Sequence, residues 1–197
     1  MSMPSIMIIC EKCQYSGSTI RLWGRHEYID GQINIKVKSV LGWCGSCAEL
    51  VAIEDFSDEQ HLLQTLAKKR KIVRRRLKKR TFMALPFRKK VDMRDSLQEI
   101  EACVAKLTLI GTRRGRERCL VCGSSQVCSL KGQWELESCG GIYVGSRRTG
   151  FMHPGCGGEF VATSCEYNFN IALSVRYYDF SGALVKQCRA DDINIEL

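Results

Sequence analysis

Four short pairs of cysteine or histidine residues constrain this chain more than any other feature of its sequence. Two residues separate the members of each pair, and the pairs are Cys10–Cys13, Cys44–Cys47, Cys119–Cys122 and His153–Cys156. Thirty residues separate the first pair from the second, and thirty separate the third from the fourth. Each member of the last two pairs lies 109 positions after its counterpart in the first two. This equal offset indicates an internal repeat that governs the fold.

The spacing within each pair is typical of metal ligands. Two such residues form a tight turn that directs both side chains at one ion, and two turns complete a tetrahedral set. Consecutive pairs are expected to combine, so that one ion is held by Cys10, Cys13, Cys44 and Cys47, and a second by Cys119, Cys122, His153 and Cys156. Four protein ligands leave no open coordination position, which favours a structural over a catalytic role.

Other assignments of the thiols stay open from the sequence alone. The first set could instead be buried free thiols or a redox pair, and Cys139 or Cys165 could replace His153 in the second set. Five cysteines lack the paired spacing and are interpreted as small buried hydrophobic residues. These are Cys103, Cys128, Cys139, Cys165 and Cys188.

The paired ligands resemble those of the zinc-ribbon superfamily, in tandem copies. The resemblance covers about 55 residues at each end of the chain and implies two structural zinc ions. It also implies that each pair of turns caps a small antiparallel sheet. Between the first two pairs, Ile33, Ile35 and Val37 alternate with polar residues, as in a half-buried strand. The predicted fold class is therefore α+β: two small antiparallel zinc-ribbon modules joined by an antiparallel helical hairpin.

The connector between the modules has two helical patterns. Ser57-Asp58-Glu59 is typical of a helix start, and this helix is expected to end before Pro86. A second start is expected at Asp95-Ser96, with Gly111 as the stop. The predicted domains are residues 1–56 (first ribbon), 57–111 (basic helical connector) and 112–197 (second ribbon). The last also contains a hairpin around residues 179–182, expected to enlarge the sheet of the second ribbon.

The net charge of +9 is concentrated in the connector. Thirteen basic residues lie between positions 68 and 90 with no acidic residue among them, whereas the rest of the chain has 17 basic and 21 acidic residues. They are Lys68, Lys69, Arg70, Lys71, Arg74, Arg75, Arg76, Lys78, Lys79, Arg80, Arg88, Lys89 and Lys90. Like charges along a helix reduce its stability unless a polyanion neutralises them, which favours contacts with phosphates. Arg113 and Arg114 are expected to extend this surface.

These patterns predict a non-catalytic, zinc-stabilised protein that grips the phosphate backbone of DNA or RNA without reading its sequence. It would be a subunit of a larger nucleoprotein complex with protein partners. The HExxH, Walker and GxSxG motifs of common enzyme classes are absent from the sequence. Twelve cysteines without a secretory signal at residues 1–10 favour the cytoplasm, the nucleoid or the nucleus, and no apolar stretch is long enough for a membrane span. The alternative is a protein–protein adaptor, such as an inhibitor or immunity-type protein, whose basic helix docks an acidic partner.

Overall fold

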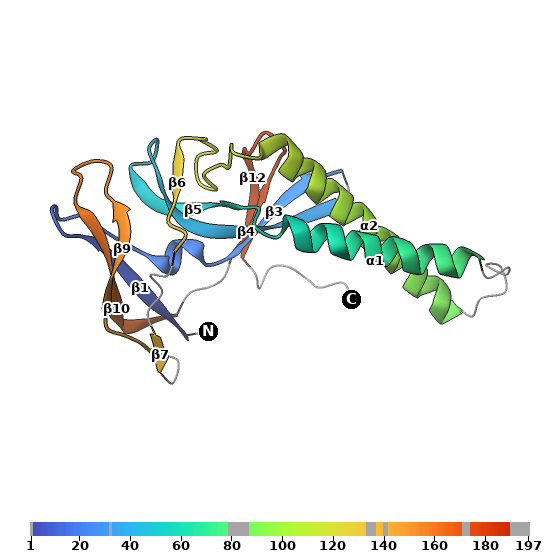
Figure 1. The fold of residues 1–197 in the computed structure, drawn as a ribbon, viewed down its shortest axis with the longest axis horizontal. Helices are drawn as coiled ribbons and strands as arrows, with labels where there is room; N and C mark the ends of the chain where they lie inside the picture. The colour runs from blue at the N-terminus through green and yellow to red at the C-terminus, as the bar shows by residue number, and fades with distance from the viewer. Residues whose placement is uncertain are drawn as a thin grey trace.

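Two larger sheets, a two-stranded sheet and a pair of long helices make up the described part of the chain (Figure 1). The computed structural model describes residues 2–31, 33–78, 87–132, 137–139, 142–170 and 174–189. A four-stranded antiparallel sheet has the order β2 (Ser16–Ser18), β1 (Ser2–Cys10), β10 (Glu159–Asn170), β9 (Ser146–Met152). A short 3-10 helix, η1 (Thr19–Leu22), follows β2, and β7 (Glu137–Cys139) pairs with β8 (Ile142–Val144).

The larger sheet has six strands and is mixed. Its main path runs β12 (Leu184–Arg189), β11 (Ser174–Tyr178), β3 (Arg25–Asp30), β4 (Ile33–Cys44), β5 (Glu49–Asp55), and β6 (Val127–Ser129) pairs with the end of β4. Among the strand pairs of the described residues, β11–β3 alone is parallel. In β4, Ile35 and Val37 are buried between exposed neighbours, which confirms the alternation predicted for this segment.

Both sheets contribute to one hydrophobic core, and α2 covers a second. In the first, Ile8 of β1 and Phe160 of β10 pack with Leu41 and Trp43 of β4. In the second, side chains of the six-stranded sheet such as Tyr28 pack against α2. The C-terminal half of β4 therefore joins the two sheets, and its N-terminal half packs beneath α2.

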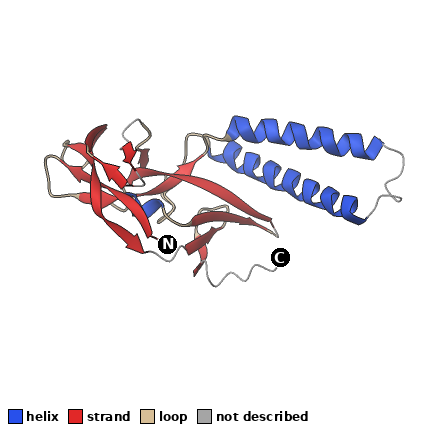
Figure 2. Ribbon diagram, turned by 90° about the horizontal axis from the view of Figure 1, so that it is seen from below, coloured by secondary structure: helices blue, strands red, loops and turns tan. Residues whose placement is uncertain are grey.

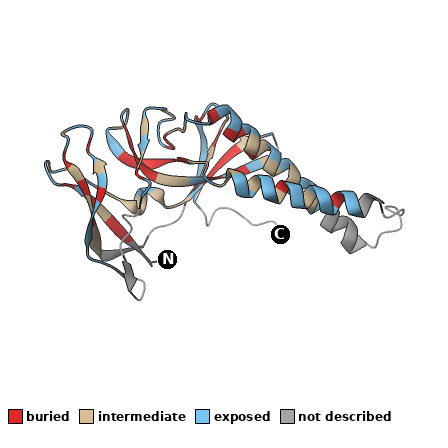
Figure 3. Ribbon diagram, viewed as in Figure 1, coloured by how far each residue is buried: buried red, intermediate tan, exposed pale blue. Residues whose placement is uncertain are grey.

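The helices α1 (Glu59–Lys78) and α2 (Phe87–Arg113) form an arm that extends from one end of the body (Figures 1 and 2). They run antiparallel, because Glu59 at the start of α1 pairs with Arg114 just after α2, and Lys69 pairs with Glu99 farther along. Leu66 and Val73 are buried, whereas most of the outer surface of the arm is exposed (Figure 3). The helix α2 begins eight residues before the expected start and continues through Gly111. A glycine inside a helix costs only about 1 kcal/mol, and the buried side chain of Arg113 holds the last turn.

Strand pairing crosses the boundaries that the sequence suggested at residues 57 and 112. The strand β1 pairs with β10 over most of its length, and β6 pairs with β4. The predicted C-terminal hairpin is present as β11 and β12, but it adds to β3 rather than to the sheet that contains β9 and β10. The expected position was wrong because Tyr178 of β11 packs with Tyr28 of β3 beneath α2. Both β3 and α2 lie far from β11 along the chain, so no local pattern indicates this packing.

Candidate metal centres

The first cluster of donors joins the turn after β1 to the turn between β9 and β10. Cys10 is the last residue of β1 and Cys13 lies in the turn after it, while His153 and Cys156 lie in the turn between β9 and β10. Since β1 pairs with β10, the two turns meet at the same end of the sheet. The Sγ atoms of Cys10 and Cys156 are 3.4 Å apart, and His153 Nδ1 is 3.3 Å from the Sγ atoms of Cys13 and Cys156. We call this set the outer quartet.

The backbone of the second turn is shaped for close approach to the thiols. Gly157 N–H donates to the carbonyl oxygen of His153 at 2.8 Å, and Gly158 N–H donates to Cys156 Sγ at 3.4 Å. A Cβ atom at Gly158 would lie 2.4 Å from Lys12 Cβ and 2.7 Å from Cys10 Sγ. Only glycine at position 158 therefore allows the two turns to pack at this distance.

Three aromatic side chains hold the His153 imidazole in place. The His153 ring centroid lies 4.6 Å from that of Trp43, 5.1 Å from that of Tyr15 and 5.2 Å from that of Phe160. His153 is buried, and the packing leaves Nδ1 facing the thiols. Cys165 is not part of the quartet, and the side chain of Cys139 lies outside the described residues.

The second cluster, the inner quartet, comes from the middle of the chain. Cys44 ends β4 and Cys47 lies in the turn before β5, while Cys119 and Cys122 precede β6. The Sγ atoms of Cys44 and Cys122 are 3.6 Å apart, and those of Cys47 and Cys119 are 3.9 Å apart. The pairing of β6 with β4 and a single bridge between Ile53 and Cys119 bring these turns together.

Both quartets have the dimensions of a tetrahedral metal site. With Zn–S bonds of about 2.3 Å, the sulfur atoms of a tetrahedron lie about 3.8 Å apart, close to the separations above. All donor atoms of each quartet lie within 4.8 Å of one another. Burial raises the pKa of the Cys119 thiol to about 11. Although burial also acts on Cys10, backbone N–H groups of Lys12 and Cys13 outweigh it and lower its pKa to about 6. A bound cation would stabilise all of these thiolates together.

The eight predicted donors are those of the two quartets, but the expected grouping was wrong. The sequence suggested that consecutive pairs would combine, whereas the first pair joins the fourth and the second joins the third. The reason is the strand pairing, because β1 lies beside β10 and β4 lies beside β6. Each quartet therefore links the two halves of the chain.

The basic residues predicted to bind nucleic acid fall into three groups. On α1, Lys68, Arg70, Lys71, Arg74 and Arg75 are exposed. Four of them line a hollow of about 550 Å³ together with Ala67. Lys69 is partly covered and pairs with Glu99 of α2. The third group lies outside the described side chains: Arg76, Lys78, Lys79, Arg80, Arg88, Lys89 and Lys90.

Arg113 does not belong to a nucleic-acid surface, and its predicted role was wrong. Its guanidinium is buried, pairs with the fully buried Glu54, and donates to the hydroxyl of Tyr28 at 2.8 Å and the carbonyl oxygen of Phe180 at 2.5 Å. The sequence shows only a run of arginines, and a buried acidic partner 59 positions away leaves no local signal. Arg114 is exposed, as expected, and pairs with Glu59.

Comparisons with protein-family models, with curated proteins and with solved structures find no match to this chain. Neither described helix has an apolar segment long enough to cross a membrane. The function must therefore be inferred from the two quartets, the arm and the surface of the body.

Proposed function

We propose that this protein is a non-catalytic, zinc-stabilised nucleic-acid-binding protein that grips the phosphate backbone through the basic face of α1. The observation that carries the proposal is the row of exposed basic side chains on an arm that projects from the body. The proposal includes membership of a larger nucleoprotein complex. Contacts to phosphates would make the binding independent of base sequence.

The positions of the basic residues on α1 support a continuous contact surface. Arg70, Lys71, Arg74 and Arg75 follow the helical period, while Leu66 and Val73 face the other helix. At about 1.5 Å per residue, Lys68 to Arg75 span about 10 Å of helix. A duplex carries one charge per about 1.7 Å of its axis, so this length faces about six phosphates.

Zinc is the ion we propose for both quartets. Thiolate and imidazole donors with four protein ligands are those of structural zinc sites, and two ions are expected per chain. Each ion would supply about 10–16 kcal/mol of folding free energy. The outer quartet would fix the N-terminal and C-terminal strands together, and the inner quartet would fix the body that carries the arm. The closed coordination of both sites supports a structural role rather than a catalytic one.

A salt titration of the purified, metal-loaded protein tests the proposal. If the five exposed basic residues of α1 each neutralise a phosphate, log K should fall with log salt with a slope of about −4 to −5. The double substitution Arg74→Glu and Arg75→Glu should weaken binding to both DNA and RNA and reduce the slope by about 2. A matched control, Lys38→Glu with Lys186→Glu, makes the same charge change on exposed positions of the body. Equal loss of affinity in the two double variants would contradict the proposal.

A protein–protein adaptor is the second candidate function, and exposed apolar residues of the arm favour it. Leu63 and Ile72 of α1 are 50% and 41% exposed, and Leu97 and Val104 of α2 are 44% and 39% exposed. An acidic protein partner would contact both these residues and the basic face. A complex that survives nuclease treatment and high salt would support the adaptor. Co-purification of nucleic acid that is released by salt would support the first proposal.

A further inference from the structure

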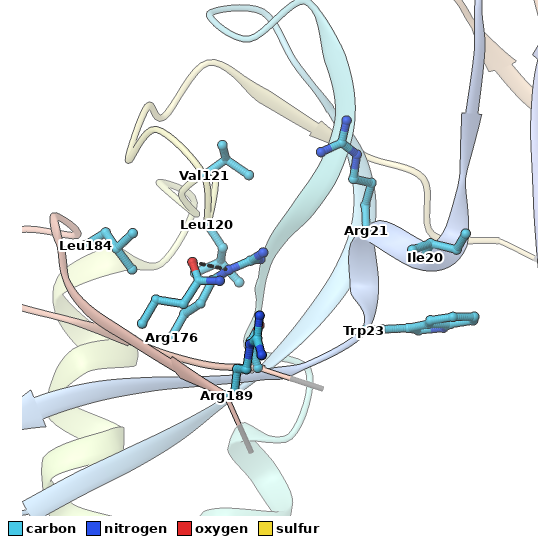
Figure 4. Close-up of a pocket in the computed structure, with 10 residues that line it drawn as sticks. Ile20, Arg21, Trp23, Leu120, Val121, Arg176, Leu184 and Arg189 are labelled. Atoms are coloured by element: carbon cyan, nitrogen blue, oxygen red, sulfur yellow. Dashed lines mark hydrogen bonds between the residues drawn. The ribbon is translucent and has the colours of Figure 1, made fainter. Parts of the chain in front are cut away.

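A cleft of about 660 Å³ lies on the body, away from the arm and outside both quartets. Its floor is one face of the β11–β12 hairpin, where Arg176 lies opposite Gln187 and Ser174 lies opposite Arg189. Residues from η1 and the segment after it form one wall, and the turn that contains Cys119 and Cys122 forms another. Figure 4 shows the lining side chains and the separate segments that carry them.

Three arginines give this cleft a strong positive charge. Arg21, Arg176 and Arg189 line it, and none of the described lining residues is acidic. Arg21 reaches Glu49 at 3.2 Å, but both side chains are about half exposed, so the pair is weak. Arg176 Nε donates to Gln187 Oε1 at a long 3.4 Å, and within the described residues the side chain of Arg189 has no hydrogen bond or ion pair. The three guanidinium groups are therefore available to an anion.

The walls of the cleft are apolar. In Figure 4, Ile20 and Trp23 lie beside Arg21 to the right of Arg176 and Arg189, whereas Val121 lies above them and Leu184 to their left. Leu120 also lines the cleft. Val121 is 53% exposed and Leu184 is 49% exposed, so their apolar surface is open to a ligand. A volume between about 300 and 1,000 Å³ with apolar walls and a few convergent polar groups is typical of small-molecule sites. The ligand that fits combines an anionic group with a flat apolar one.

We propose that this cleft binds a nucleotide, with its phosphate on Arg176 and Arg189 and its base against the apolar walls. Guanidinium groups bind phosphate oxygens through charge-assisted, bidentate hydrogen bonds. The base has a flat apolar face for Val121 and Leu184, and polar edges for Ser174 and Gln187 on the floor. The nucleotide is either free or a unit of a single strand, since the recognised chemistry is the same. This site is separate from the basic face of α1, and the inference does not rest on the proposed function.

The inner quartet positions part of this cleft. Val121 lies between Cys119 and Cys122, and its N–H donates to Cys119 Sγ at 3.3 Å. The preceding residue, Leu120, is tied to the sheet because the Tyr178 hydroxyl donates to its carbonyl oxygen at 2.7 Å. A metal ion in the inner quartet would hold one apolar wall against the floor. We therefore expect bound nucleotide to slow removal of one of the two ions by a chelator.

The test uses the metal-loaded full chain and three probes: AMP, a short single-stranded oligonucleotide, and inorganic phosphate. Titration calorimetry of the wild type is compared with Arg176→Gln/Arg189→Gln. The matched control Lys36→Gln/Lys38→Gln removes the same charge from exposed positions of β4. We expect AMP to bind the wild type and the control equally, and to bind the cleft variant at least about tenfold more weakly. Circular dichroism and thermal unfolding establish that the variants fold.

The outcomes separate this inference from the function proposed above. If the oligonucleotide alone loses affinity in the cleft variant, the ligand is a nucleotide within a strand; if AMP loses it as well, the free nucleotide suffices. Inorganic phosphate that binds as tightly as AMP would overturn the inference, because the apolar walls would contribute nothing. Equal affinities of the cleft variant and the wild type for both AMP and the oligonucleotide would also overturn the inference. The proposed function is tested by the α1 variants alone, so either result can stand without the other.

Discussion

Replacing Arg113 by methionine tests the most buried charged contact described in the body. Arg113 and Glu54 have side-chain exposures of 5% and 0%. Without the guanidinium, Glu54 keeps the hydroxyl of Tyr28 and the N–H of Arg118, while the carbonyl oxygen of Phe180 loses its charged donor. Breaking a buried ion pair by removing one partner costs about 3–5 kcal/mol. For a chain of this size, that corresponds to a decrease in Tm of about 6–20 °C.

Urea unfolding of the metal-loaded protein measures this change. The exposed Arg114, which is 73% exposed and pairs only with Glu59 at the surface, provides the matched control Arg114→Met. Its unfolding free energy should change by less than about 1 kcal/mol. In a double-mutant cycle with Glu54→Gln, the combined loss should be smaller than the sum of the single losses by at least about 1 kcal/mol. An Arg113→Met variant as stable as Arg114→Met, or strictly additive losses, would refute this account.

The pH dependence of the Arg113→Met variant provides a second check. Burial raises the pKa of Glu54 even though Tyr28 and Arg113 lower it, and removing Arg113 raises this pKa further. Between the pKa of Glu54 in the unfolded chain and its higher pKa in the folded variant, the folded variant holds a proton that the unfolded chain has released. The stability of the variant therefore decreases as pH rises through this range. The destabilisation relative to the wild type should therefore shrink as pH falls from 7 toward 5. An equal difference at both pH values would contradict the role of Glu54.

The remaining predictions concern the metal sites, a buried histidine and a glycine. With cadmium in place of zinc, NMR correlations should connect one ion to both Cys10 and Cys156, and an ion shared by consecutive pairs would contradict the grouping. Burial, aided by Arg176, lowers the pKa of His26 to about 4. The unfolded chain therefore takes up a proton near pH 6.5 that the folded chain does not, and stability should fall by about 3 kcal/mol between pH 6.5 and 4. The free energy of unfolding of His26→Gln, measured by urea titration at each pH, should not show this decrease. The same decrease in the variant would contradict the assignment to His26. A Cβ at Gly42 would lie 2.1 Å from an isoleucine side chain of β5 and 2.6 Å from a carbonyl oxygen of β6. The free energy of unfolding of Gly42→Ala, measured by thermal unfolding, should therefore be lower by about 1–3 kcal/mol. Gly45→Ala should show no such loss, because a Cβ there would lie 3.6 Å from the nearest atom.

The sequence identifies the metal donors because the two-residue spacing is itself the local geometry of the turn. Cys10 and Cys13 must point in one direction whatever the rest of the chain does. Which other turn they meet depends on the pairing of β1 with β10, more than 140 positions away. Spacing along the chain contains no information about that contact. The sequence therefore predicts which residues are donors, but it does not predict which pairs of donors combine.

Local patterns also predict the α1 start and the C-terminal hairpin, which need only neighbouring residues. Arg113 shows where such patterns fail. It stands in a run of arginines that resembles a solvated surface, and its burial depends on Glu54 of β5 and on Phe180 in the turn between β11 and β12. The cleft of Arg21, Arg176 and Arg189 is invisible to sequence reasoning for the same reason, since its cations are scattered over 169 positions.

The two quartets are nested along the chain, with residues 44–122 enclosed by residues 10–156. A ribosome releases the chain from its N-terminus, so the inner set is complete once residue 122 has emerged, whereas the outer set must wait for residue 156. Until then the first two thiols stay without their partners, and the nascent β1 has no neighbour in β10. We expect the inner ion to be captured first, and a fragment that ends between residues 130 and 152 to keep that ion while its β1 strand has no β10 to pair with.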